Sequence, residues 1–148
     1  MDLNMFAEKV NLTPNETIGQ MQALAEEGFL RKVGGGFGMT EKGKAALKAF
    51  AAVDKETGFH FYMGIDQPTE CTAESVGTFY VCIRQVSVQS LEFHTYRGDF
   101  EKWLGEVCQD AELASHFEGA KAAELKGEEL RKELLGAIDA KYGVAALT

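Results

Sequence analysis

The residues best suited to chemistry lie in one short stretch, where His94, Arg97, Asp99 and Trp103 follow one another closely. A histidine can act as a general base, and a nearby aspartate can orient its ring. However, the chain shows no serine or cysteine in a recognisable nucleophile turn, and no second carboxylate with an obvious partner. We therefore favour a structural knot, in which the imidazole and an Arg–Asp pair close the turn between two helices. The prediction is that the protein is not an enzyme, and a small enzyme acting around His94 is the least supported alternative.

Metal and nucleotide sites are not predicted. The spacing of the histidines and cysteines matches no common zinc pattern; these residues are His60, His94, His116, Cys71, Cys82 and Cys108. The cysteines form no CxxC pair, which favours reduced thiols. The glycine-rich stretch 34–38 lacks the Lys-Ser/Thr pair that follows a phosphate-binding loop. We expect no cofactor and no metal.

Charge is distributed unevenly along the 148 residues. Residues 1–56 contain seven Lys/Arg and eight Asp/Glu, a net charge of −1, whereas residues 57–148 contain eight and fifteen, a net charge of −7. An acidic surface repels phosphate, so any contact with nucleic acid is expected in the N-terminal third. The sequence has no run of about 18 apolar residues and does not begin like a signal peptide. We therefore expect a cytoplasmic protein without a membrane contact.

Residues 1–55 are expected to form a first domain of helices around one hairpin. Apolar spacing predicts a short helix from Leu3 to Val10, and Thr13 begins the capping box of a second helix, Pro14–Glu27. Gly28 ends that helix. The strand candidates 29–33 and 37–39 flank a glycine turn at 34–36, which predicts a tight hairpin. Thr40 caps a further helix, whose predicted inward side chains are Ala46, Leu47, Phe50 and Ala51.

This order of elements, with the stretch GFLRKVGGGFGMTEKG at residues 28–43, resembles a winged helix-turn-helix domain over about residues 3–52. The resemblance implies that Pro14–Glu27 is the recognition helix and that the hairpin is the wing. Asn and Gln side chains can read adenine edges, and Lys and Arg can bind phosphates. The residues implied for DNA binding are Asn15, Thr17, Gln20, Arg31, Lys32, Lys42 and Lys44, with Lys48 behind them.

The implied recognition helix differs from typical DNA-binding helices in its charge. It has no Lys or Arg and carries Glu16, Glu26 and Glu27, although phosphate contacts supply much of the affinity for DNA. The alternative is therefore a non-enzymatic protein-interaction module that reuses the fold without binding DNA. Such a module would present an exposed apolar patch formed by Phe29, Phe37 and Met39.

A polar segment ending at Gly58 predicts a domain boundary near Lys55, so that residues 56–148 form an acidic, all-helical second domain. Residues 59–63 are aromatic and have no clear assignment, and residues 64–69 are typical of a loop. Thr72 is expected to begin a buried helix. The apolar stripe of that helix consists of Val76, Phe79, Tyr80, Ile83 and Val86.

Four further helices are expected after this one. The first ends near Tyr96, with a short strand at 91–95 as the alternative; Gly98 breaks the chain and Asp99 caps the next helix. Asp110 caps a short helix, and a charged link then runs to Gly127. The last helix carries Leu130, Leu134, Ile138 and Tyr142 on one stripe, with Glu128 and Lys132 as an i,i+4 pair.

The segments TAESV, SLEFHTYRGDFEKWL and DAELA resemble an uncharacterised prokaryotic domain family over about residues 57–118. The matching positions are Phe59, Phe61, Ser90, His94, Arg97, Asp99, Phe100 and Trp103. This resemblance implies a mostly helical fold and no particular activity.

The predicted fold class is α+β and mostly helical: a winged-helix-like N-terminal module with a small β-hairpin wing, followed by an all-α C-terminal domain. The leading functional prediction is a DNA-binding transcriptional regulator, whose C-terminal domain serves dimerisation or binds a partner or effector. The expected partners are double-stranded DNA and a second copy of the chain or another protein. The effector is not defined by the sequence.

Overall fold

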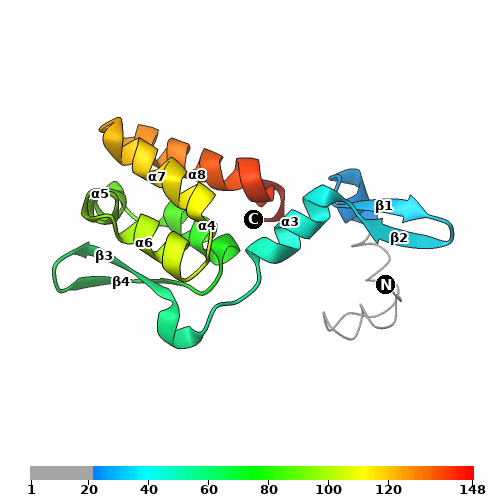
Figure 1. The fold of residues 1–148 in the computed structure, drawn as a ribbon, viewed down its shortest axis with the longest axis horizontal. Coiled ribbons are helices and arrows are strands. Elements are labelled where there is room, and N and C mark those ends of the chain that lie inside the picture. The colour runs from blue at the N-terminus through cyan, green and yellow to red at the C-terminus, as the bar shows by residue number, and fades with distance from the viewer. Residues whose placement is uncertain (1–21) are drawn as a thin grey trace. The chain divides into compact units, whose positions relative to one another are not determined.

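The computed structural model describes residues 22–148. The chain divides into two units between Lys48 and Ala49. Figure 1 labels their helices and strands, and each unit is described by itself. The division falls shortly before the boundary expected near Lys55. The described part is mostly helical with two antiparallel hairpins, which confirms the α+β, mostly helical class. None of the described helices combines the length and apolarity needed to cross a membrane.

In the first unit, the helix before the hairpin ends where the sequence predicts. Residues 22–26 are helical, and Gly28 has a φ of +89°. The Gly28 N–H donates to the Ala25 carbonyl at 3.1 Å, and the Phe29 N–H donates to the Leu24 carbonyl at 2.9 Å. This pair of bonds is the Schellman arrangement, which needs a left-handed residue at the position of Gly28. The beginning of the predicted helix Pro14–Glu27 and the predicted helix from Leu3 to Val10 lie outside the described residues.

The predicted hairpin is confirmed. Strands β1 (Leu30–Val33) and β2 (Gly36–Met39) pair antiparallel, with Leu30 opposite Met39 and Val33 opposite Gly36. The turn is therefore the two residues Gly34 and Gly35, and Gly36 already belongs to β2 rather than to the predicted three-residue turn. Gly34 has a φ of +59°, which a residue with a side chain would adopt at a cost.

Helix α3 (Glu41–Ala49) follows and is capped by Thr40, as predicted. The Thr40 Oγ1 accepts the Gly43 N–H at 3.0 Å and donates to the Gly28 carbonyl at 2.6 Å. The predicted inward stripe is only partly right. Ala46 is buried, but Leu47 is 63% exposed, and Phe50 and Ala51 are exposed as well. The inward positions of the first unit's part of α3 are Gly43 and Ala46, because residues three apart share a helix face.

The face that α3 turns toward the hairpin leaves no room for a side chain at Gly43. A Cβ there would lie 2.1 Å from the Phe29 carbonyl oxygen and 2.8 Å from Met39 Cγ. Phe29 itself is only 3% exposed, so the patch predicted from Phe29, Phe37 and Met39 is not presented as expected; the other two side chains are half-buried. Glycine at position 43 is thus required for the close approach of helix and hairpin.

We expect Gly43→Ala to destabilise the first unit by about 1–3 kcal/mol, because the added methyl overpacks against backbone that cannot rotate away. Hydrogen-exchange mass spectrometry of peptides from residues 22–48 would measure the change. Gly136→Ala, where nothing lies within 4 Å of the added Cβ, is the matched control. It should leave the exchange of residues 22–48 unchanged and can only slow exchange in its own helix, α8. Equal protection of residues 22–48 in Gly43→Ala and wild type would contradict this expectation.

The second unit is not all-helical, and the prediction on this point is wrong. Strands β3 (Phe59–Gly64) and β4 (Gln67–Ala73) form a hairpin that contains the unassigned aromatic run and most of the predicted loop. The predicted helix begins four residues later than expected, at Val76, because Ser75 and Thr78 form its capping box. The remaining elements of the unit are η1 (Lys55–Thr57), α4 (Val76–Gln85), α5 (Val88–Arg97), α6 (Asp99–Glu106), α7 (Ala111–Ala122), α8 (Gly127–Tyr142) and η2 (Ala145–Leu147).

The helices of this unit cover one side of the β3–β4 hairpin, as Figure 1 shows, with α5 against β3 and α4 against β4. The predicted stripes of α4 and α8 are buried, and α5 is helical, so the alternative strand at 91–95 is wrong. Helix α7 extends through much of the predicted link. The centre of the core is aromatic, and its fully buried rings are Phe61, Phe79, Phe100 and Phe117.

Candidate functional site

The residues predicted to bind DNA fall into three groups. Asn15, Thr17 and Gln20 lie outside the described residues. Arg31 and Lys32 are exposed on β1, and neither side chain has a hydrogen-bond or ion-pair partner within the described part of the chain. Their neighbouring positions on one strand direct them to opposite faces of the hairpin. Both faces of the hairpin therefore carry a free cation.

Lys42 and Lys44 are engaged elsewhere. The Lys42 ammonium donates to the Glu27 carbonyl at 2.8 Å and lies 4.5 Å from the centre of the Phe29 ring. It thus completes the end of the helix before the hairpin, where a cation interacts favourably with the unpaired carbonyls. Lys44 pairs with Glu41 at 3.4 Å on the exposed surface, a contact that stabilises little and breaks easily. Lys42 therefore mainly stabilises the fold of the first unit.

In the second unit, the structure brings His94, Arg97 and Asp99 together (α5 and the start of α6). The Tyr62 N–H donates to His94 Nε2 at 2.8 Å, and His94 Nδ1 lies 2.8 Å from Asp99 Oδ2. Because a backbone N–H can only donate, Nε2 is the acceptor, and Nδ1 carries the proton that is donated to Asp99. The imidazole is 3% exposed and joins β3 to the turn between two helices.

Asp99 does not cap α6, contrary to the prediction. Gly98 occupies the cap position with a φ of +78°, and Asp99 is the first helical residue. Its carboxylate instead accepts from His94 and lies 3.3 Å from Arg97 Nε. Arg97 is 51% exposed, and its guanidinium lies 4.7 Å from the centre of the Phe93 ring. The turn is therefore closed by an imidazole and an Arg–Asp pair.

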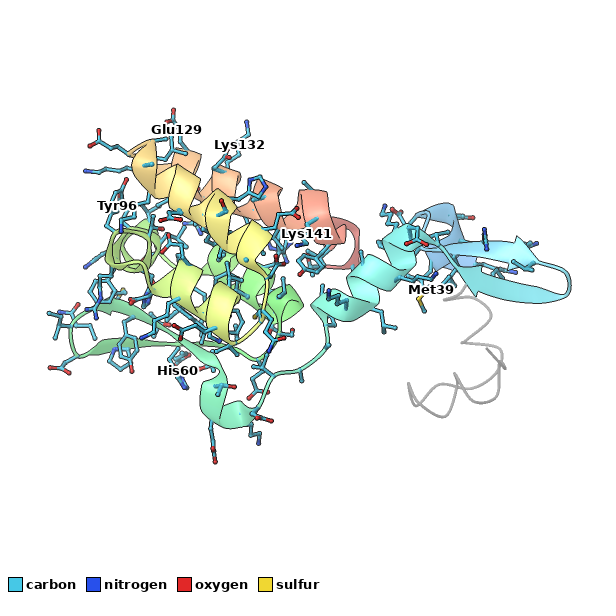
Figure 2. The ribbon with its side chains drawn as sticks, viewed as in Figure 1. Met39, His60, Tyr96, Glu129, Lys132 and Lys141 are labelled. Carbon is cyan, nitrogen blue, oxygen red and sulfur yellow. The ribbon has the colours of Figure 1, made fainter. Side chains whose placement is uncertain are left out.

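Trp103, the fourth predicted residue, lies beside this knot without bonding to it. Its Nε1 donates to the Thr57 carbonyl at 2.7 Å, which fixes η1 against α6. All four residues contribute to the wall of one hollow of about 530 Å³ between β3 and the helices α5 and α6. The other side chains that matter for its chemistry are Tyr62, Asp66, Phe93, Lys102 and Glu106. Figure 2 shows His60, another wall residue, on the hairpin strand that forms one side.

The geometry argues against His94 as a general base. Burial lowers the pKa of His94 below 6.5, although the hydrogen bond and charge of Asp99 act to raise it. The lone pair of Nε2 is already occupied by the Tyr62 N–H, so no ring nitrogen is free to accept a proton from a substrate. Among residues 22–148, no three His, Cys, Asp or Glu side chains gather as a metal site requires.

The cysteines are free thiols. Burial raises the pKa of Cys82 to about 12, with Cys71 contributing, and burial raises that of Cys108 to about 12, with the charge of Asp110 contributing. A thiol acts as a nucleophile in its thiolate form, so both are poor nucleophiles near neutral pH.

Two polar clusters were missed by sequence reasoning. Asp110 is buried and, besides capping α7 as predicted, accepts from Lys141 and Tyr142 of α8. Arg131 donates from Nη1 to the carbonyls of Ile83, Arg84 and Val86 at 2.7–3.1 Å, and so closes the end of α4. Glu128 pairs with Arg131 at 2.8 Å rather than with the predicted Lys132. The contacts of Asp110 with α8 and of Arg131 with the end of α4 join different helices, so no local spacing could have indicated them.

Comparison of the chain with protein-family models, curated proteins and solved structures gives no match. The functional argument therefore rests on the residues and contacts described above.

Proposed function

We propose that the protein is a DNA-binding regulator that contacts duplex DNA through the β1–β2 hairpin of its first unit. The single observation that carries the proposal is the pair of free cations, Arg31 and Lys32, on opposite faces of a hairpin whose tip is made of glycines. A tip without side chains can enter a groove about 6 Å wide. Cations on both faces can then reach the phosphates of the two flanking strands.

The charge of the first unit supports the same proposal. Residues 1–48 contain six Lys/Arg and six Asp/Glu, a net charge of 0, and their described part, residues 22–48, has a net charge of +2 from five and three; residues 49–148 contain nine and seventeen, a net charge of −8. Lys48 is also exposed on α3. Phosphate contacts supply most non-specific affinity for DNA, so the cations of the hairpin and α3 are the natural source of attraction. The acidic second unit is then left for pairing of subunits or for a partner or effector.

The test is fluorescence anisotropy of a random DNA duplex at low salt and at increasing salt. We expect wild type to bind and to weaken as salt rises, and the double variant Arg31→Glu with Lys32→Glu to lose at least about tenfold in affinity. Loss of two phosphate contacts should also reduce the slope of log affinity against log salt by about two.

The matched control is Lys126→Glu with Lys132→Glu, two exposed lysines of the second unit whose reversal changes the net charge by the same amount. If this control weakens binding as much as the hairpin variant, attraction comes from overall charge and not from the hairpin. If wild type does not bind at low salt, the DNA proposal fails. The exposed apolar side chains of the first unit, Val33 on β1 and Leu47 on α3, would then be the surface to test for a protein partner.

A further inference from the structure

The hollow beside the His94 knot has the properties of a small-ligand site. Its volume of about 530 Å³ lies within the usual range for such sites, about 300–1,000 Å³. Strand β3 forms one wall, and α5 and α6 form the other. The walls are held in place by the bonds of His94 to Tyr62 and Asp99 and by the bond of Trp103 to Thr57. The hollow is therefore largely formed before any ligand arrives.

Aromatic side chains provide an apolar surface inside the hollow. Tyr62 and Phe93 are half-buried wall residues, and Trp103 and Phe59 lie deeper, with their ring centres 5.7 Å apart. Aromatic side chains held in fixed positions bind the apolar or aromatic part of a ligand favourably. The hollow thus offers its ligand both area and a fixed shape.

Two cations in the same wall are available to a ligand. Arg97 uses Nε for Asp99 and places its guanidinium over Phe93, so its two terminal nitrogens remain without a partner among the described residues. The Lys102 ammonium, one helical turn along α6 from Asp99, likewise has no partner among them. A guanidinium with both terminal nitrogens free can hold a carboxylate by two parallel bonds.

Carboxylates elsewhere in the wall restrict the charge of the ligand. Asp66 and Glu106 are exposed and have no partner among the described residues, whereas Asp99 is already paired with Arg97. The wall thus carries two positive and three negative side chains, so an anion with several charges is repelled, and a single carboxylate is held only through direct bonds to Arg97 and Lys102. We propose that this hollow binds a small carboxylic acid with an aromatic or aliphatic body, its carboxylate between Arg97 and Lys102. The site is independent of DNA binding by the first unit.

The test uses three probes with one apolar body: 3-phenylpropanoate, 3-phenylpropanol and 3-phenylpropyl phosphate. Trp103 is the only tryptophan of the chain and lines the hollow, so its fluorescence reports occupancy, and calorimetry measures affinity independently. We expect the carboxylate to bind about tenfold more tightly than the alcohol, because only it forms charge-assisted bonds. We expect the phosphate to bind more weakly than the carboxylate.

Lys102→Gln is the decisive variant, because the lysine makes no contact on which folding depends. This variant should lower the affinity for the carboxylate probe by about three- to tenfold and leave the affinity for the alcohol unchanged. Lys132→Gln on α8, which Figure 2 shows away from β3, is the matched control and should bind all three probes as wild type does. The proposal would be overturned if the carboxylate and the alcohol bound equally well or if the phosphate bound more tightly than the carboxylate. It would also be overturned if millimolar carboxylate gave no saturable change in Trp103 fluorescence.

Discussion

Replacement of Asp110 by alanine is expected to lower the free energy of unfolding of the second unit by about 3–4 kcal/mol, near the lower end of the range for a broken buried ion pair. The Asp110 carboxylate accepts from Lys141 Nζ at 2.6 Å, from the Tyr142 hydroxyl and from the Leu113 N–H at 3.0 Å. Alanine leaves all three donors without this acceptor. Lys141, labelled in Figure 2, is partly exposed and can turn to water, which limits the loss.

Urea unfolding followed by Trp103 fluorescence would measure this change. Glu112→Ala is the matched control, because Glu112 also lies near Lys141, at 4.0 Å, but is exposed; its removal should change stability by less than about 0.5 kcal/mol. Similar losses in both variants would show that the charge near Lys141 matters and the buried carboxylate does not.

The same interaction predicts a dependence on pH. Burial alone would raise the pKa of Asp110, but the hydrogen bonds from Lys141, Tyr142 and Leu113 outweigh it and hold the pKa below 3.8. The stabilisation is therefore complete above pH 3.8 and is lost as the pH falls through the folded pKa. The difference between wild type and Asp110→Ala should shrink on acidification.

The Asp110 cluster shows how far the sequence could predict such a site. A carboxylate before an apolar helical pattern indicates a cap, and Asp110 does cap α7. The stripe of α8 likewise indicated that Tyr142 would be buried. Their contact could not be predicted, because it depends on how α7 and α8 pack and joins residues 32 positions apart in the chain. Local rules find caps and stripes, and tertiary packing decides which polar groups meet.

The missed strand β4 has a different physical cause. Pro68 and the polar residues around it are typical of a loop, and Pro is unfavourable where both sides of a strand are paired. In a sheet of only two strands, each strand has one unpaired edge, and the pairing around Tyr62 and Pro68 is irregular. The capping box of α4 uses Thr78 where the usual sequence signature has Glu or Gln, so the helix start was placed too early.

Asp99 was assigned the wrong partner for a related reason. An aspartate after a glycine resembles a helix cap, and the sequence does contain the expected break at Gly98. Gly98 adopts the left-handed conformation, and its N–H bonds back to His94 and Thr95, so the chain reverses tightly. That reversal directs the Asp99 side chain to His94, five residues earlier, instead of to its own helix. The knot among these residues was anticipated, but its link to β3 through the Tyr62 N–H was not.

Substitution of His94 by phenylalanine is expected to destabilise the second unit by about 2–4 kcal/mol at pH 7.5, although phenylalanine preserves a planar ring. The ring of His94 packs within 6 Å of the centres of Phe59, Phe61 and Phe100, so most apolar contacts survive. The Tyr62 N–H, which is partly buried, loses its acceptor, and Asp99 loses a donor at 2.8 Å. Urea unfolding measures the loss, and His116→Phe, at an exposed position of α7, is the control that should change little.

The effect of pH on this variant tests whether burial keeps His94 neutral in the folded protein. Because burial lowers the pKa of folded His94 below 6.5, the unfolded chain takes up a proton at a pH where the folded chain does not. Wild type should therefore lose stability as the pH falls below about 6.5, and His94→Phe should lose less, so that the two approach each other in acid. A constant difference across this range would mean that burial does not keep His94 neutral in the folded protein. If His94→Phe were as stable as wild type at pH 7.5, the bonds of His94 would not stabilise the fold. A role of His94 as a general base would then have to be considered again.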